Sequence, residues 1–239
     1  FIGEAGGWVY YARPRLGGDG PFDAAAVASA TARLAALGLP EVVEWVHETT
    51  PALLGAVQAE GSLQIEEIPL LVLDGDLSSG APEVPPDVTV RLLTPADADQ
   101  VVAARAVADV SFAAAGTELG AAGPAERDAA RRPAEQRDLD LLAEGALRVA
   151  VAESEREGVL ATGRTMPVDG VTEVGGVATL PAARRQGLEA AVTAALVDDA
   201  AAIGVSTVFL TASSGDVARV YERVGFRRVA TGYAAERAS

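Results

Sequence analysis

The apolar and polar positions of the chain follow two periods, one typical of strands and one typical of helices. In the second part of the chain, short runs rich in Val, Thr and Leu predict strands at 88–93, 146–152, 159–166, 171–179, 207–211 and 226–233. Helical spacing predicts helices at 95–112, 187–203 and 215–224, and in the charged region 124–144, where Pro133 should start or break the helix. This order indicates an α/β (α+β) fold with a mixed central sheet and helices on both faces.

The first part of the chain repeats the end of that order. The patterns predict strands at 8–13, 42–46 and 68–73, and helices at 23–37 and 51–60. Leu37-Gly38-Leu39 matches Ile203-Gly204-Val205, and Leu53, Val57 and Gly61 match Val217, Tyr221 and Gly225. We interpret these matches as the trace of an ancestral duplication, with chance similarity as the alternative. A stretch rich in proline and glycine, 74–87, predicts an exposed linker. We therefore expect a partial first domain at 1–82 and a complete second domain at 83–239.

Composition narrows the chemistry that the chain can perform. The 239 residues carry 34 acidic and 19 basic side chains, a balance that opposes nucleic-acid binding and suits an amine-bearing partner better. The absence of cysteine and the presence of one histidine, His47, exclude a thiol nucleophile and a multi-histidine metal centre. No apolar run reaches the roughly 18 residues of a membrane helix, so we expect no membrane partner. We also expect a cytoplasmic protein. Because the first residue is Phe1 rather than Met, we expect that the natural start has been removed, and a lost targeting segment stays open.

The most informative segment follows the predicted strand 171–179. It contains Arg184 and Arg185 and then Gly187, where the next helix is predicted to begin. Backbone amides at a helix start lack intrahelical partners and carry the positive end of the helix dipole, so this turn suits a pyrophosphate. Gly187 would let a phosphate approach the backbone, and the arginines would add charged donors. The alternative is an ordinary strand-to-helix turn with solvated arginines.

A second segment makes a family resemblance specific. The loop Arg184-Arg185-Gln186-Gly187 is followed by a predicted helix, a predicted strand and the helix end Tyr221-Glu222-Arg223-Val224-Gly225-Phe226. This ordered pair resembles the GNAT superfamily of acyl-CoA-dependent N-acetyltransferases, whose signatures are an Arg/Gln-x-x-Gly-x-Gly/Ala loop and a Tyr-x-x-x-Gly-Phe helix end. The resemblance covers the second part of the chain and implies acetyl-CoA as co-substrate, with no metal.

The resemblance implies a coenzyme site along one strand and the loop after it. The loop residues that would hold the pyrophosphate are Arg184, Arg185, Gln186, Gly187, Leu188 and Glu189. The backbone groups that would pair with the pantetheine arm, as if it were a further strand, are those of Val177, Ala178 and Thr179. Gly175-Gly176 would permit a bulge that opens a slot there. Ser214 stands where the family often has an asparagine on the pantetheine, and its alternative role is that of a helix N-cap.

Two side chains are candidates for proton transfer. The resemblance implies Tyr221 as the general acid that protonates the departing thiolate. Its alternative is a core aromatic, because it lies on an apolar helical stripe, although a tyrosine can bury its ring and keep its hydroxyl at a slot. Glu173 on the predicted strand 171–179 is the candidate general base for the incoming ammonium group. Its alternative is an ordinary solvent-facing carboxylate.

The sequence departs from the family pattern at several positions. Glu189 replaces the last Gly or Ala of the loop signature; it suits the helix dipole but would repel a phosphate if its side chain turned inward. Ser214 replaces the usual asparagine. In the first part of the chain, the turn 13–18 lacks the loop spacing and Val57 stands in place of the tyrosine, which predicts a degenerate domain that covers the catalytic domain or frames the acceptor site. Trp45 and His47 are expected to be structural.

Three functional hypotheses remain. The leading hypothesis is a bacterial tandem acyltransferase that moves an acetyl group directly from acetyl-CoA to a primary amine, without an acyl-enzyme because the chain has no cysteine. A small-molecule amine is the expected acceptor, with protein N-termini or lysines as alternatives. The second hypothesis is a non-catalytic acyl-CoA-binding or interaction module, and the third is a dimerisation scaffold. The sequence leaves a homodimer open and predicts no nucleic-acid partner.

Overall fold

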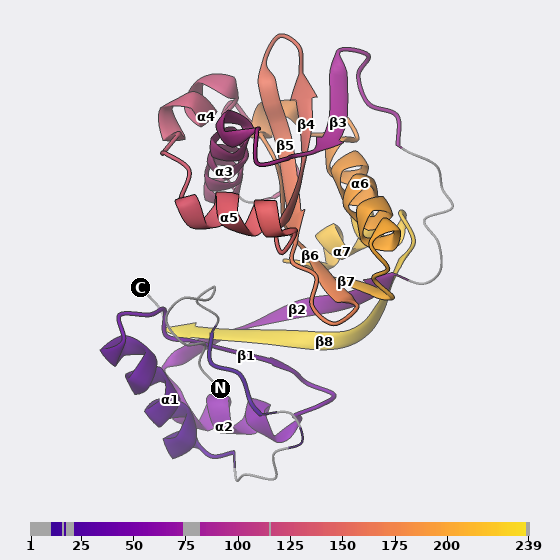
Figure 1. Ribbon diagram of the computed structural model, residues 1–239. Coiled ribbons are helices and arrows are strands. Elements are labelled where there is room, and N and C mark those ends of the chain that lie inside the picture. The colour runs from indigo at the N-terminus through magenta and orange to yellow at the C-terminus, as the bar shows by residue number, and fades with distance from the viewer. Residues whose placement is uncertain (1–10, 16, 18–21, 74–81, 115, 238–239) are drawn as a thin grey trace. The chain divides into compact units, whose positions relative to one another are not determined.

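The computed structural model describes residues 11–15, 17, 22–73, 82–114 and 116–237 (Figure 1). Contacts within the chain define two compact units. Unit 1 comprises Phe1–Leu71, Thr211–Ala218 and Arg228–Ser239, and unit 2 comprises Val72–Leu210 and Arg219–Arg227. Unit 1 is therefore assembled from both ends of the chain. The domain boundary expected at residue 82 stays a prediction.

Unit 2 contains the greater part of the predicted order. Its elements are β3 (Val88–Leu92), α3 (Ala98–Ala113), α4 (Pro124–Ala130), α5 (Gln136–Glu144), β4 (Arg148–Ser154), β5 (Gly158–Thr165), β6 (Val171–Thr179), the 3-10 turn η1 (Pro181–Ala183), α6 (Leu188–Ala202) and β7 (Thr207–Thr211). The helix break expected at Pro133 falls between α4 and α5. The chain continues through α7 (Gly215–Glu222) into β8 (Phe226–Arg237). Most of the expected linker 74–87 lies outside the described residues.

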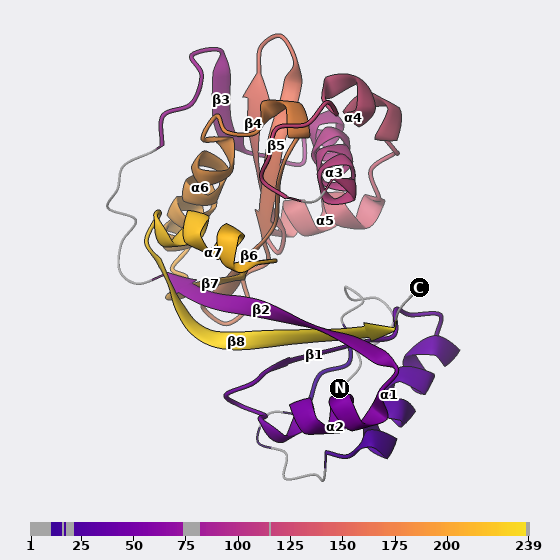
Figure 2. The same ribbon diagram turned by 180° about the vertical axis from the view of Figure 1, so that it is seen from behind.

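The strands of unit 2 form a mixed sheet in the order β7-β6-β5-β4-β3. Strands β3 to β6 pair antiparallel with their neighbours, and β6 and β7 pair parallel. Helix α6 packs on one face of this sheet, and α3 with α4 and α5 lies on the other (Figures 1 and 2). The predicted mixed sheet with helices on both faces is confirmed.

Strands β5 and β6 are joined by a tight two-residue turn. Asp169 and Gly170 both have positive φ, 48° and 78°. Val168 and Val171 exchange two backbone hydrogen bonds of 2.9 Å across them. Positive φ at both central residues is the two-residue hairpin turn whose twist matches that of the strands. This turn fixes where β6 begins.

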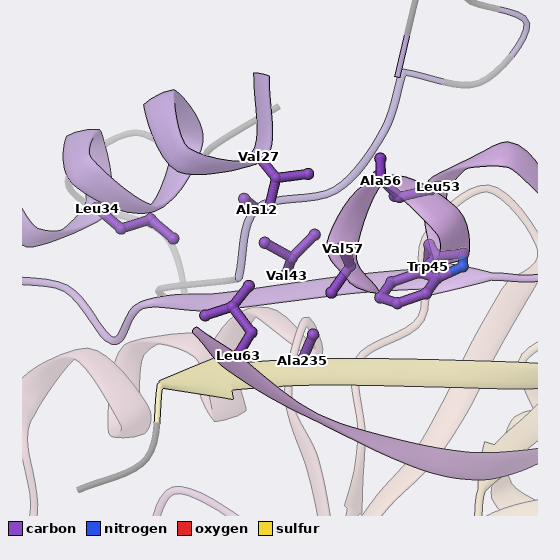
Figure 3. Packing of buried hydrophobic residues seen from close by; sticks show 10 residues of the cluster. All are labelled: Ala12, Val27, Leu34, Val43, Trp45, Leu53, Ala56, Val57, Leu63 and Ala235. Carbon is purple, nitrogen blue, oxygen red and sulfur yellow. The ribbon is translucent and has the colours of Figure 1, made fainter. Parts of the chain in front are cut away.

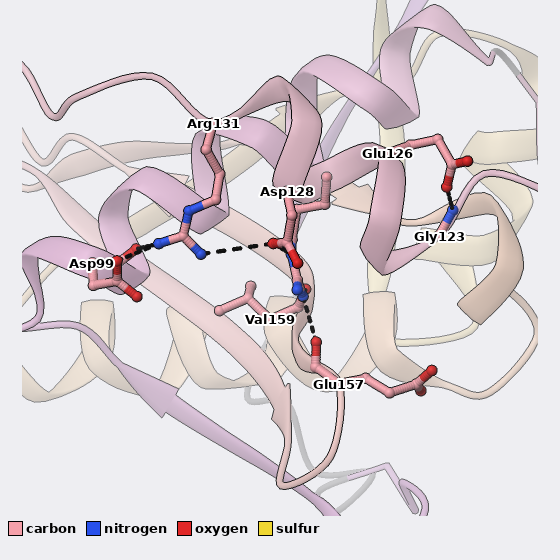
Figure 4. Close-up of polar contacts among 8 residues, drawn as sticks. Asp99, Gly123, Glu126, Asp128, Arg131, Glu157 and Val159 are labelled. Atoms are coloured by element: carbon pink, nitrogen blue, oxygen red, sulfur yellow. Dashed lines mark hydrogen bonds and ion pairs between the residues drawn. The ribbon is translucent and has the colours of Figure 1, made fainter.

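A buried arginine ties α4 to the β4–β5 hairpin. Arg127 is 6% exposed and donates hydrogen bonds from Nη1 to the carbonyl oxygens of Glu157 and Val159, at 2.6 and 2.7 Å. Its Nε donates to Asp128 at 2.9 Å, and Asp128 also contacts Arg131, whose guanidinium reaches Asp99 (Figure 4). A buried guanidinium is tolerated because its donors are satisfied by carbonyls and a carboxylate.

Unit 1 contains α1 (Ala24–Ala36), β1 (Val42–Val46), α2 (Ala52–Glu60) and β2 (Leu63–Leu73). Strand β8 lies between β1 and β2, pairing antiparallel with β1 from Val42↔Glu236 to Val46↔Gly232. The helices and strands enclose an apolar core made of Ala12, Val27, Leu34, Val43, Trp45, Leu53, Ala56, Val57, Leu63 and Ala235 (Figure 3). Of the strand expected at 8–13, Ala12 forms a bridge to Val43, and residues 8–10 lie outside the described part.

Helices α1 and α6 end in the same way. Gly38 and Gly204 have φ of 68° and 82°, and each donates its N–H to the carbonyl three residues earlier at 3.0 Å. The next residues, Leu39 and Val205, each donate to the carbonyl five residues earlier at 2.9 Å. This is the helix ending in which a left-handed glycine satisfies the last free carbonyls. The two matched tripeptides therefore have the same local structure. No helix among the described residues is both long and apolar enough to cross a membrane.

Candidate active site

Strands β6 and β7 run together for only part of their length. Their parallel register comprises Val171↔Thr207, Thr172↔Val208 and Glu173↔Phe209. Within the described chain, no β7 residue is in register with β6 beyond Glu173. The edge of β6 from Val174 to Thr179 is therefore open on the β7 side, which leaves its backbone groups available for another extended segment.

A bulge bends β6 at the same place. On the β5 side, Thr162 pairs with Ala178 and Arg164 pairs with Gly175, so two residues of β6 face one residue of β5. Gly176 has a φ of 60°, a conformation that favours glycine. The expected bulge at Gly175-Gly176 is present. The bulge bends β6, so the part of the strand after it leaves the plane of the pairing before it.

The loop between β6 and α6 is compact. After η1, Arg185 has a φ of 64° and Gly187 a φ of 76°, and α6 begins at Leu188. Gly187 provides no side-chain cap for the first turn of α6. The N–H groups of that turn therefore have no capping side chain as a partner. They lie at the positive end of the helix dipole, which suits an anion site.

Tyr221 and Glu189 meet in unit 2. Tyr221, in the last turn of α7, is 6% exposed, and its ring packs edge-on against Phe226 with centroids 6.0 Å apart. The Tyr221 hydroxyl and the Glu189 carboxyl group, in the first turn of α6, share a hydrogen bond. Burial raises the pKa of Glu189 above its ordinary value, against the lowering influence of Tyr221 and Arg184. Burial, and next the nearby Glu189 carboxylate, raise the pKa of Tyr221.

Comparison with known proteins places this arrangement in a family. Residues 118–226 match the Acetyltransferase (GNAT) family. This segment belongs to the GNAT family. A GCN5-related N-acetyltransferase from Kribbella flavida is 29% identical over 92% of this chain and 78% of its own, with a TM-score of 0.64. None of the curated proteins matches the chain.

Other GNAT structures share the fold at lower identity. A GCN5-related N-acetyltransferase from Sphaerobacter thermophilus is 18% identical over 81% of this chain and 58% of its own, with a TM-score of 0.55. A tandem GNAT protein from the clavulanic acid biosynthesis pathway is 15% identical over 90% of this chain and 70% of its own, with a TM-score of 0.54. Both likenesses concern the fold alone.

The two arginines of the GNAT loop are engaged with the chain itself. Arg184 donates to the carbonyl oxygens of Ala114 at 2.6 Å, Glu118 at 3.0 Å and Ser111 at 3.4 Å. Arg185 is exposed and forms an ion pair with Glu118 at 2.9 Å. Arg184 therefore connects the loop to the end of α3 and to the segment that follows it, a positioning role that no periodicity in the sequence could reveal. Of the two arginines, Arg185 is the one that presents its charge at the surface.

The remaining predicted coenzyme residues take ordinary places on these elements. Ala178 and Thr179 are buried and Val177 is half-buried on β6, while Gln186 and Gly187 are exposed in the loop and Leu188 is buried at the start of α6. The Thr179 hydroxyl is buried and has no hydrogen-bond partner among the described residues. Glu173 is half-buried on β6, opposite Phe209 at the last register pair before the strands part.

Ser214 has a local structural role. Its hydroxyl accepts a hydrogen bond from the Val217 N–H at 3.3 Å, and its carbonyl accepts from Ala218 at 2.9 Å. Ser214 is therefore the N-cap of α7, the alternative that the sequence left open. A coenzyme contact for Ser214 stays a prediction.

Unit 1 places Trp45 and His47 beside a third aromatic residue. Their rings lie 5.1 and 5.7 Å from that of Tyr233, and Trp45 is 4% exposed. The position matched to Tyr221 is Val57, which belongs to the apolar core. A hydrocarbon at that position has no proton to donate, and the degeneracy of the first part stays a prediction.

Proposed function

We propose that unit 2 transfers an acetyl group from acetyl-CoA to a primary amine. The observation that carries the proposal is the open edge of β6 from Val174 to Thr179, which begins where β7 leaves the register at Glu173. An extended pantetheine arm carries amide groups, so it can pair with such an edge as a strand does. Membership of residues 118–226 in the GNAT family supports the same donor.

The residues present fit the coenzyme in three respects. The backbone of Val177, Ala178 and Thr179 offers donors and acceptors, and the buried Thr179 hydroxyl still lacks a partner among the described residues. The first-turn amides of α6 suit the pyrophosphate. Arg185 can add a charge, because its surface pair with Glu118 contributes little stability and is readily exchanged. Arg184 acts by holding the loop.

In the proposed reaction, acetyl-CoA supplies a thioester carbonyl to the attacking amine. Glu173 takes one proton from the ammonium group, so that the nitrogen can form its bond to the carbonyl carbon. Tyr221 donates its hydroxyl proton to the sulfur as the carbon–sulfur bond breaks. The nitrogen loses its second proton to the solvent as the amide forms, and Glu173 releases the first one there too. One proton returns from the solvent to Tyr221, so the net products are the amide, the free thiol and one released proton. Transfer is direct because the chain has no cysteine to carry the acetyl group.

We further propose that unit 1 contains a degenerate copy of the end of the GNAT fold. The matched endings of α1 and α6 at Gly38 and Gly204 support this relationship. Val57 in place of the tyrosine assigns the chemistry to unit 2.

A second function, non-catalytic binding of an acyl-CoA, is favoured by one observation. Glu189 stands in the first turn of α6, beside the loop that should receive phosphates, at a position where the family has Gly or Ala. A negative charge there opposes an anion and lowers coenzyme affinity.

Two measurements on the full chain test the proposal. Calorimetry with acetyl-CoA should detect binding, and release of free thiol should follow when a panel of small primary amines, peptides and lysine is added. Binding without thiol release for any acceptor would support the non-catalytic function. The absence of binding heat at millimolar acetyl-CoA would contradict both functions.

A further inference from the structure

The connection between α3 and α4 has no helix or strand over residues 116–123, and it lies against η1. The Gly120 N–H donates to the carbonyl oxygen of Pro181 at 3.1 Å, and the Ala182 N–H donates to the carbonyl oxygen of Ala122 at 2.9 Å. The two bonds run in opposite directions between the connection and η1. They therefore hold the two segments side by side, directly before the loop that leads into α6.

Gly120 permits a close approach between these two segments. A Cβ atom on Gly120 would lie 2.8 Å from the Cβ atom of Pro181, a separation that real Cβ atoms essentially never show. Pro181 is buried and its ring fixes its own backbone, so it cannot turn aside as a long side chain can. Alanine at position 120 would therefore push the connection away from η1.

Arg184 adds a side-chain link to the same stretch of chain. Its guanidinium donates to the carbonyl oxygens of Ala114 at 2.6 Å, Glu118 at 3.0 Å and Ser111 at 3.4 Å. Three acceptors are served by one planar fork of N–H groups, a geometry that lysine does not offer. The side chain of Arg185 is 60% exposed, so its charge is the one that an incoming phosphate can meet.

The backbone of Arg185 shows why the loop needs an anchor. Its φ of 64° lies in the left-handed region, which residues other than glycine adopt rarely and only where neighbouring contacts hold them. Arg184, directly before it, is bound to three carbonyl groups, and the Arg185 side chain pairs with Glu118 at 2.9 Å. Both contacts end on the same stretch of chain. Release of the connection would therefore free the loop to leave this conformation.

We propose that Arg184 couples coenzyme binding at the first turn of α6 to the position of the connection 116–123. It does so as a positioning residue that touches no phosphate, and the inference rests on the coenzyme binding of the proposed function. The coupling is reciprocal. Whatever the connection contributes to coenzyme affinity, the bound coenzyme returns as stabilisation of the connection.

Affinities for acetyl-CoA, measured by calorimetry on the full chain, test the role of Arg184. Arg184→Met should weaken binding about tenfold. Arg184→Lys should lose nearly as much, because an ammonium group keeps the charge but cannot serve three carbonyl groups with a planar fork. Arg185→Met should reduce the salt dependence of the affinity, since it removes an exposed charge, and Arg184→Met should leave that dependence unchanged. Wild-type affinity in Arg184→Lys overturns the inference.

A double-mutant cycle tests the junction from its other side. Gly120→Ala changes no charge, yet it should weaken acetyl-CoA binding about as much as Arg184→Met does. The double variant should bind no more weakly than either single variant, because both changes break the same junction. Gly55→Ala, on α2 with open space around it, is the matched control and should keep the wild-type affinity. Losses that multiply in the double variant overturn the inference.

A donor without phosphates separates positioning from a general folding defect. S-acetylpantetheine carries the thioester but no pyrophosphate. In Arg184→Met, kcat/KM for acetyl-CoA should fall about tenfold, while kcat/KM for S-acetylpantetheine should stay within about twofold of the wild type. Equal losses with both donors overturn the inference.

Hydrogen exchange of the wild type tests the coupling without any substitution. The Gly120 and Ala182 N–H groups, whose bonds join the two segments, should exchange at least about fivefold more slowly with saturating acetyl-CoA. The Val168 N–H, bonded to Val171 in the β5–β6 turn, should change less. Unchanged exchange at Gly120 and Ala182 in a chain that binds acetyl-CoA overturns the coupling and leaves the proposed function standing. A chain that binds no acetyl-CoA contradicts the proposed function itself.

Discussion

A Cβ atom on Gly187 would lie 2.9 Å from the backbone carbonyl oxygen of Glu83. Real Cβ atoms essentially never approach another atom so closely. The obstacle is a backbone atom, which cannot move aside as the end of a flexible side chain can. Gly187 also has a φ of 76°. The chain itself therefore requires glycine at this loop position, in addition to any phosphate that approaches it.

The first prediction concerns the stability of the loop. Gly187→Ala should lower the free energy of unfolding by about 2–4 kcal/mol, because strain at positive φ and the contact with Glu83 both act. The measurement is urea denaturation without coenzyme. Gly204→Ala is the matched control, since Gly204 has a φ of 82° and open space around it, and it should lose about 1–2 kcal/mol. Equal losses in the two variants would show that the Glu83 contact contributes nothing.

Local signals determined how far the sequence could predict the fold. Both ends of strand β6 could be predicted from the sequence, because the turn-forming pair Asp169-Gly170 precedes the strand and Pro181 follows it. Strand β8 extends to Arg237, beyond the predicted end at residue 233, because its final residues pair with β1. Such pairing depends on residues distant in sequence, and a strand's own pattern contains no trace of its partner.

The same distinction applies to the site. The bulge at Gly176 could be predicted because two adjacent glycines inside a strand leave no side chains to pack and typically mark a bulge. The contacts of Arg184 could not be predicted, because the sequence does not show which carbonyl groups an arginine beside a helix start will bind. The sequence also showed that Glu189 departs from the family pattern, but it gave no sign that Glu189 interacts with Tyr221.

The second prediction concerns the general acid. Tyr221→Phe should lower thiol release by about 10²–10⁴-fold, since it removes the proton donor, and should leave acetyl-CoA binding within about threefold. Steady-state kinetics and calorimetry measure the two effects. Tyr233→Phe, in unit 1, is the matched control and should retain full activity. Loss of coenzyme binding in Tyr221→Phe would instead indicate a packing role.

The third prediction concerns the general base. Glu173→Gln should lower kcat by about 10²-fold or more with little change in acetyl-CoA affinity, because the amide cannot take the ammonium proton. The loss should diminish as pH rises and the free amine becomes abundant in solution. Glu155→Gln, in the exposed turn between β4 and β5, should leave the rate unchanged. A loss that is constant across pH would contradict the base role.

The fourth prediction concerns the buried arginine of α4. Arg127→Met should lower the free energy of unfolding by about 3 kcal/mol, because the carbonyl oxygens of Glu157 and Val159 lose their donor inside the protein. Urea denaturation measures the loss. Arg132→Met is the control, since that side chain is 74% exposed and its ion pair with Asp109 lies at the surface. It should change stability by less than about 0.5 kcal/mol.

The fifth prediction follows from the raised pKa of Glu189. A carboxyl group whose pKa is higher in the folded state binds more protons there, so its contribution to stability is complete below the unfolded pKa of about 4.3 and is lost as pH rises through the folded pKa. Glu189→Gln should therefore match the wild type near pH 4 and be more stable at pH 8. Thermal unfolding across this range checks the sign. A difference between the two proteins that does not vary with pH would contradict it.

The pairing of β1 with β8 also constrains how the chain is made. Strand β1 leaves the ribosome before unit 2 is synthesised, yet its neighbour is residues 226–237. Until that stretch has been synthesised, the edge of β1 that β8 will cover is exposed to other chains. The N-terminal elements therefore complete their sheet only after unit 2 has had time to fold, and a ribosome stalled before residue 226 would present an unfinished sheet as a seed for aggregation.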